Sequence, residues 1–155
     1  MNNDIYAEEQ GLNIHIVNER QILLAPLLGC RFRSDAAVIY DYPIDAIFFG
    51  KKVLDYLDQM DRHDLKLKEK YKDYWLMPKG MTSWRKFEKS ALTLLLLHKN
   101  SSLELYRNYL SPDGGFVQES EEPNLVLSRT ITPKELGEII LSQFEYIRNA
   151  SKKLS

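Results

Sequence analysis

The sequence contains very little cysteine, no excess of either charge and no long apolar run. Its 155 residues include one cysteine, Cys30, which excludes an intramolecular disulfide framework and is typical of a reducing compartment. The 21 lysines and arginines nearly balance the 22 aspartates and glutamates, and a net charge of -1 argues against a general nucleic-acid binder. The longest run of one aliphatic residue type is the leucines at 94–97, whereas a membrane-spanning helix needs about 20 apolar residues.

The first residues also lack the features of a targeting segment. Asp4, Glu8 and Glu9 stand where a signal peptide has positive charge followed by an apolar stretch. We therefore expect a cytoplasmic protein that does not act at a membrane. No repeat, low-complexity tract or flexible linker divides the sequence, so residues 1–155 are expected to form a single domain.

The pattern of apolar residues predicts an α+β fold, in which one antiparallel β-sheet is flanked by helices. Residues 21–26 are interpreted either as the hairpin partner of the first strand or as a short helix. Turn-forming residues at 99–102 join the third and fourth predicted strands into a hairpin. The predicted strands are residues 12–17, 74–77, 92–98, 103–108 and 125–131.

The first predicted helix covers residues 46–60. Asp45 precedes it and is a good N-cap, because its carboxylate can accept a hydrogen bond from a free amide of the first turn. Gly50 lies inside this helix, where glycine costs roughly 1 kcal/mol relative to alanine. A glycine at such a position most simply lets another backbone approach closely.

Two further helices are predicted in the second half of the sequence. A short one begins after Ser83 and buries Phe87. The other covers residues 132–149 and opens with Thr132-Pro133-Lys134-Glu135, a capping box with proline at the first helical position. Apolar residues recur along the second helix at helical spacing, which predicts that it packs in the core.

The sequence lacks the established catalytic signatures. It has no glycine-rich phosphate loop, no HExxH, no GxSxG and no CxxC motif. His15 and His98 lie in predicted strands and are interpreted as structural residues with satisfied hydrogen bonds, and no base is evident for Cys30. We therefore predict no catalytic residue, no cofactor and no enzymatic activity.

Carboxylates near the end of the first helix give the main alternative. Asp55, Asp58 and Asp61 are spaced to lie on one helix face. No metal site is predicted there, because a helix C-terminus disfavours negative charge and no second ligand set is evident. The rival interpretation is a small hydrolase or nuclease that uses His63 together with Asp58, Asp61 or Asp64.

Lysines alternate at positions 66, 68, 70 and 72, close to aromatic residues. Basic and aromatic residues together are typical of proteins that bind single-stranded nucleic acid. Acidic residues lie among these lysines, so a solvated face is the preferred interpretation and no direct nucleic-acid contact is expected.

An acidic segment is the strongest functional candidate. Residues 113–122 contain four acids and no base, and aromatic residues lie within the segment or just before it. Complementary charge speeds encounter with a basic partner, and aromatic side chains supply binding hot spots. A polar connection between strands is the alternative interpretation. The candidate partner-binding residues are Tyr109, Asp113, Phe116, Glu119, Glu121 and Glu122.

Three segments stand out by their order and spacing: DAIFFGKKVL at 45–54, SWRKFEK at 83–89 and ITPKELGEII at 131–140. Together they resemble the contact-dependent growth inhibition immunity proteins of bacteria. The family shows a helix with a "D…LG…VL" pattern, a short helix with lysine and phenylalanine before the sheet, and a terminal "sPeELG" helix. This sequence has Phe49 where the family has leucine, and Lys134 and Glu135 where it has two acids.

The resemblance implies an immunity protein that binds and neutralises the toxic C-terminal domain of a contact-delivered effector. Such toxins are often nucleases, and the immunity protein stays in the cytosol. A nuclease cleft must attract phosphates, so our hypothesis is that Glu119, Glu121 and Glu122 occupy that cleft in place of the nucleic-acid backbone. An adaptor that binds some other protein is the second alternative.

Overall fold

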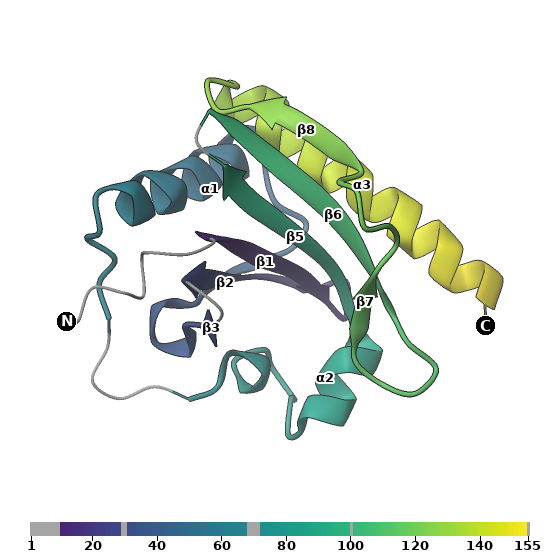
Figure 1. Ribbon diagram of the computed structural model, residues 1–155. Helices are drawn as coiled ribbons and strands as arrows, with labels where there is room; N and C mark the ends of the chain where they lie inside the picture. Colours follow the sequence, from purple (N-terminus) through teal and green to yellow (C-terminus); the bar gives the residue numbers. More distant parts are fainter. Residues whose placement is uncertain (1–9, 29–30, 68–71, 100, 155) are drawn as a thin grey trace.

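The computed structural model describes residues 10–28, 31–67, 72–99 and 101–154 (Figure 1). These residues form one antiparallel β-sheet with helices packed against it, which confirms the predicted α+β class. Among the described residues, no helix combines the length and the apolar character needed to cross a bilayer.

The sheet is built around four long strands in the order β2-β1-β5-β6, and every strand pair is antiparallel. Shorter strands complete both edges: β3 and β4 pair with different parts of β2, and β7 and β8 pair with different parts of β6. The strands are β1 (Gln10–Val17), β2 (Gln21–Leu28), β3 (Arg31–Phe32), β4 (Val38–Asp41), β5 (Ala91–Lys99), β6 (Ser102–Leu110), β7 (Phe116–Gln118) and β8 (Leu125–Ser128).

Helices α1 (Ala46–Asp61) and α3 (Pro133–Leu154) cover one face of the sheet (Figure 1). Because side chains alternate along a strand, every second residue of β1 faces these helices, and Leu12, Ile14 and Ile16 are fully buried there. Phe49 of α1 and Phe144 of α3 are buried in the same core. This layer holds the larger of the hydrophobic clusters.

Two glycines set the distance between α1 and α3. A Cβ atom at Gly50 would lie 1.8 Å from the carbonyl oxygen of Pro133, and one at Gly137 would lie 1.9 Å from that of Ala46. The first turns of the two helices therefore touch backbone to backbone. The close approach predicted for Gly50 is confirmed, and the partner is the other helix that was predicted to pack in the core.

The opposite face of the sheet is covered by a shorter layer, which contains η3 (Tyr74–Leu76) and α2 (Trp84–Ser90). The prediction of a strand at 74–77 is wrong, since these residues form a 3-10 turn. A four-residue apolar run has no periodicity that distinguishes the two, and Tyr74 is buried by stacking on His15 at a ring distance of 5.7 Å.

The other predicted helices and strands are confirmed, with shifted boundaries. Residues 21–26 belong to β2, the hairpin partner of β1, and not to a helix. The Asp45 carboxylate accepts from the amide of Phe48 at 2.9 Å, and the Ser83 hydroxyl accepts from that of Lys86 at 3.2 Å. The predicted strand 125–131 ends at Ser128, and α3 continues to Leu154, five residues past the predicted end.

Candidate protein-docking surface

The six predicted partner-binding residues lie along one edge of the sheet. Tyr109 is in β6 and Phe116 is in β7, and the turn between these strands contains Asp113. Glu119, Glu121 and Glu122 lie in the connection between β7 and β8. We refer to the four carboxylates Asp113, Glu119, Glu121 and Glu122 as the acidic edge.

The four carboxylates of the acidic edge differ in their surroundings. Glu119 accepts from Nε of Arg107 at 2.9 Å and from Nδ2 of Asn124 at 2.6 Å. Asp113, Glu121 and Glu122 are exposed, and none of them forms an ion pair with a described residue. Glu119 therefore fixes the loop, while the other three present unpaired charge to solvent.

Arg107 and Asn124 close the gap between β7 and β8. The amide of Arg107 donates to Oδ1 of Asn124 at 2.7 Å, and its carbonyl accepts from the amide of Glu119 at 2.9 Å. The Arg107 guanidinium lies 4.6 Å from the centre of the Tyr146 ring on α3. These contacts hold the loop against the sheet and the helix, and a held loop loses less entropy when a partner binds.

The two predicted aromatic anchors lie on opposite faces of the sheet. Tyr109 packs against the core under α1 and α3, and burial raises the pKa of its hydroxyl, with a further contribution from the Glu119 charge. Phe116 packs on the other face, with its ring 6.1 Å from that of Trp84. The exposed apolar side chains are instead Leu110 and Val117, which are 40% and 54% exposed. Sequence reasoning missed both, because neither differs in type from a core residue.

A cavity of about 400 Å³ opens where β6 separates from β5. The pairing of these strands ends at Thr93 and Asn108, after which β6 pairs only with β7. We call the space between the two diverging strands the fork cavity. Its walls include Leu92, Asn108, Tyr109, Phe116, Ile147 and, from the last turn of α2, Glu88. Two predicted residues, Tyr109 and Phe116, thus line the same cavity from opposite faces of the sheet.

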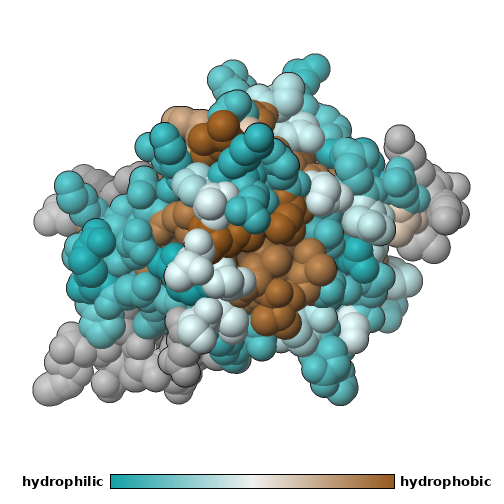
Figure 2. Space-filling model, turned by 90° about the horizontal axis from the view of Figure 1, so that it is seen from above, coloured by the Kyte–Doolittle hydropathy of each residue, from teal (hydrophilic) through white to brown (hydrophobic). Residues whose placement is uncertain are grey.

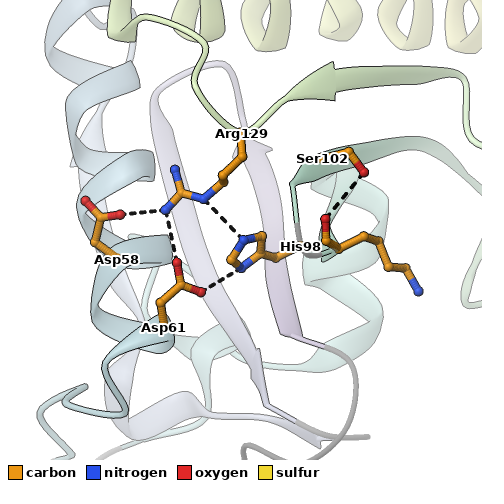
Figure 3. Close-up of polar contacts among 6 residues, drawn as sticks. Asp58, Asp61, His98, Ser102 and Arg129 are labelled. Atoms are coloured by element: carbon orange, nitrogen blue, oxygen red, sulfur yellow. Dashed lines mark hydrogen bonds and ion pairs between the residues drawn. The ribbon is translucent and has the colours of Figure 1, made fainter.

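A second polar site lies at the far end of the sheet, where β5 ends beside α1 (Figure 3). Arg129 donates to Oδ1 of Asp58 at 2.6 Å, to Oδ2 of Asp61 at 3.4 Å and to Nε2 of His98 at 3.2 Å. Because arginine only donates, Nε2 of His98 accepts, and Nδ1 donates to Asp61 across 3.0 Å. The cluster ties α1, β5 and the segment before α3 together.

This arrangement bears on the hydrolase alternative. The structure brings Asp58 and Asp61 to Arg129 and His98, whereas Asp64 forms its ion pair with Arg62 at 3.0 Å. The three carboxylates that would act together with His63 in a hydrolase therefore form ion pairs with other residues. In the part of the chain that the structure describes, no group of three histidine, cysteine or acidic side chains is placed to hold a metal ion.

His15 is fully buried on the face of the sheet under α2, and only half of its predicted hydrogen bonding is present. Its Nδ1 lies 2.8 Å from the Thr93 hydroxyl, but Nε2 has no partner among the described residues. Burial lowers the pKa of His15 to about 3, so the ring is neutral. Cys30 and two of the alternating lysines, at 68 and 70, lie outside the described residues.

Apolar side chains also reach the surface on the helix side. Figure 2 shows them gathered near the middle of the face seen from above, the side on which α3 and β8 lie in Figure 1. On the opposite face, Val126 of β8 is 61% exposed, since it alternates with Leu125 and Leu127, which pack against the core under α1 and α3. On α1, Phe48 is partly exposed, but it is engaged by the Tyr40 ring and by the Lys52 ammonium group, 5.3 Å from its centre.

No protein-family model matches the sequence, and no curated protein matches it. Among solved structures, the fold is similar to that of NMB0488, a protein of unknown function from Neisseria meningitidis. The TM-score is 0.54 and the sequence identity 14%, and the match covers 84% of this chain and 90% of that chain. At this identity the likeness shows a shared fold.

Proposed function

We propose that the chain is an immunity protein, which binds and neutralises the toxic C-terminal domain of a contact-dependent growth inhibition effector. We further propose that the toxic domain is a nuclease, that the complex forms in the cytoplasm, and that the chain acts by occupying the toxin without catalysing a reaction. The partner-binding site is the acidic edge together with the apolar side chains beside it.

The observation that carries this proposal is the acidic edge itself. Glu121 and Glu122 lie on the loop that Glu119 holds in place, and Asp113 lies in the turn before β7; all three are exposed and form no ion pair with a described residue. Val117, in β7 between these two segments, exposes apolar surface. A nuclease surface that attracts phosphate is basic, so unpaired carboxylates on a fixed loop complement it. The neighbouring apolar surface supplies the area that desolvated contacts need.

The segments that carry the family resemblance have a different role. Gly50 and Gly137 set the spacing of α1 and α3, and Ser83 caps α2. These residues build the fold, and the acidic edge lies outside all three segments. Related immunity proteins would therefore share the helices and differ in the loops that choose the toxin.

A binding experiment with charge reversal tests the proposal. The partner is the product of the gene immediately upstream, captured with the purified chain, and protection is measured as rescue of growth when both are expressed. The triple variant Asp113→Lys, Glu121→Lys and Glu122→Lys is expected to weaken binding at low salt by roughly tenfold or more, because each reversal replaces an attraction by a repulsion. Glu119 is left intact since it holds the loop.

A control triple carries the same change in net charge at exposed, unpaired positions elsewhere, and it is expected to bind within about threefold of the original chain. Its substitutions are Asp55→Lys, Asp73→Lys and Glu138→Lys. If both triple variants weaken toxin binding equally, or if the acidic-edge triple does not weaken it, the acidic edge is not the binding site. Capture of a different protein without any rescue of growth would favour the adaptor alternative.

A further inference from the structure

The fork cavity has the chemistry of a socket for a positively charged side chain. We propose that it receives an arginine or lysine side chain of the partner, which reaches in from the direction of the β6–β7 hairpin. This inference rests on the proposed function for the identity of the partner as a protein with a basic surface.

Glu88 supplies the charge of this socket. Its side chain is buried, with 8% of the residue exposed, and one carboxylate oxygen accepts from the amide of Gly115 at 2.8 Å. No described cation forms an ion pair with it, although Lys89 also lines the cavity. Burying a carboxylate without a counter-charge is unfavourable. Glu88 also lies in the last turn of α2, where the negative end of the helix dipole disfavours a second negative charge. A cation in the cavity would offset both effects.

Asn108 supplies an acceptor on a second wall. Its Oδ1 atom is buried, and it has no hydrogen-bond partner among the described residues. An unmet buried acceptor is unfavourable, and rotation of the Asn108 amide toward the cavity would let a bound donor meet it. A guanidinium group carries five N–H donors and an ammonium group three, and neither carries an acceptor. The cavity therefore offers the Glu88 carboxylate, and the Asn108 oxygen once its amide rotates, to a group that only donates.

The remaining walls suit the rest of such a side chain. Leu92 and Ile147 are aliphatic and match the methylene stem of arginine or lysine, and the aromatic side chains of Tyr109 and Phe116 add apolar surface to the same walls. A purely apolar side chain would fill the space but leave the Glu88 carboxylate desolvated without a counter-charge. A carboxylate would be repelled by Glu88, so a cation is the occupant that complements the buried charge of this cavity.

A titration of the purified chain with single-residue probes tests the socket without any toxin. The probe is N-acetyl-L-arginine N-methylamide, and its neutral counterpart is the corresponding citrulline amide, which has nearly the same shape. We expect saturable shifts of the methyl signals of Leu92 and Ile147 in nuclear magnetic resonance spectra, with a dissociation constant of roughly 1–30 mM for arginine. Citrulline is expected to bind at least about fivefold more weakly.

Glu88→Gln is the matched variant, because its amide oxygen still accepts from Gly115 while the charge is gone. It is expected to bind the arginine probe about fivefold more weakly or worse, whereas Glu138→Gln, at an exposed position of α3, leaves binding unchanged. Equal binding of arginine and citrulline by the original chain would overturn the socket. A chain that selects arginine but protects no cell would overturn the proposed function alone, and a chain that protects but shows no selection would overturn the socket alone.

Discussion

Replacing Gly50 by alanine tests the packing of α1 on α3 directly. The added Cβ atom would lie 1.8 Å from the carbonyl oxygen of Pro133 and 2.6 Å from the carbonyl carbon, both of them backbone atoms that no rotamer change can move. Ordinary contact begins near 3.4 Å. The first turns of the two helices must therefore separate by about 1.5 Å, and dispersion contacts across the interface are lost with that gap.

The expected cost follows from two opposing terms. Overpacking a well-packed core costs about 1–3 kcal/mol, and a backbone clash of this size belongs at the upper end of that range. Alanine returns about 1 kcal/mol of helix propensity relative to glycine. The free energy of unfolding is therefore expected to fall by about 2 kcal/mol, which for a chain of this size lowers the urea midpoint by roughly 1 M without changing the slope.

The matched control and the double variant make this test specific. Lys51→Ala lies at the next position on α1 but is exposed, and it is expected to change the free energy of unfolding by less than about 0.5 kcal/mol. Gly137→Ala presses on Ala46 across the same helix pair, so the double variant with Gly50→Ala is expected to cost less than the sum of the singles. A urea midpoint that stays level or rises in Gly50→Ala would refute the close approach.

Two further predictions concern the polar clusters. Arg129→Ala removes the donor shared by Asp58, Asp61 and His98. It is expected to lower the free energy of unfolding, measured by urea titration, by about 1–2 kcal/mol. The control Arg62→Ala breaks an exposed ion pair and is expected to lower it by at most about 0.5 kcal/mol. His15 has a pKa of about 3 in the folded chain, so below about pH 6 the unfolded chain binds one more proton and stability falls as the pH falls. His15→Gln is expected to flatten this dependence between pH 6 and pH 4 by up to about 1.4 kcal/mol per pH unit, and an unchanged slope in that variant would contradict the assignment.

The elements that the sequence predicted well are those with a long period or a specific cap. Residues 46–60 have helical spacing and a capping aspartate, and the structure ends this helix one residue later. The Thr132 hydroxyl accepts from the amide of Glu135 at 3.2 Å, as the capping motif predicts. The glutamate side chain returns to the threonine hydroxyl at 2.9 Å and not to its amide. Local patterns of this kind report contacts within a few residues.

Contacts between distant residues were beyond such patterns. Tyr74 and His15 are far apart in the sequence, and no local pattern indicates that their rings stack in the folded chain. Asp58 and Arg129 are likewise 71 residues apart. The acidic edge was visible because its four charges fall within residues 113–122, whereas the fork cavity draws its walls from α2, β5, β6, β7 and α3. No single stretch of sequence carries a signal for it.

The fork cavity follows from how α2 leads into β5. The helix ends at Ser90 and the strand begins at Ala91, so no linker lets the chain move away from the sheet before pairing starts. The last turn of α2 therefore stands beside the first residues of β5, and pairing with β6 begins only at Thr93. The freed end of β6 pairs with β7 instead, and Glu88 is brought to the opening because it lies in that last turn. Lengthening the connection between α2 and β5 would move the Glu88 carboxylate away from the cavity. The direct passage from Ser90 to Ala91 therefore determines both the position of this charge and the opening between β5 and β6.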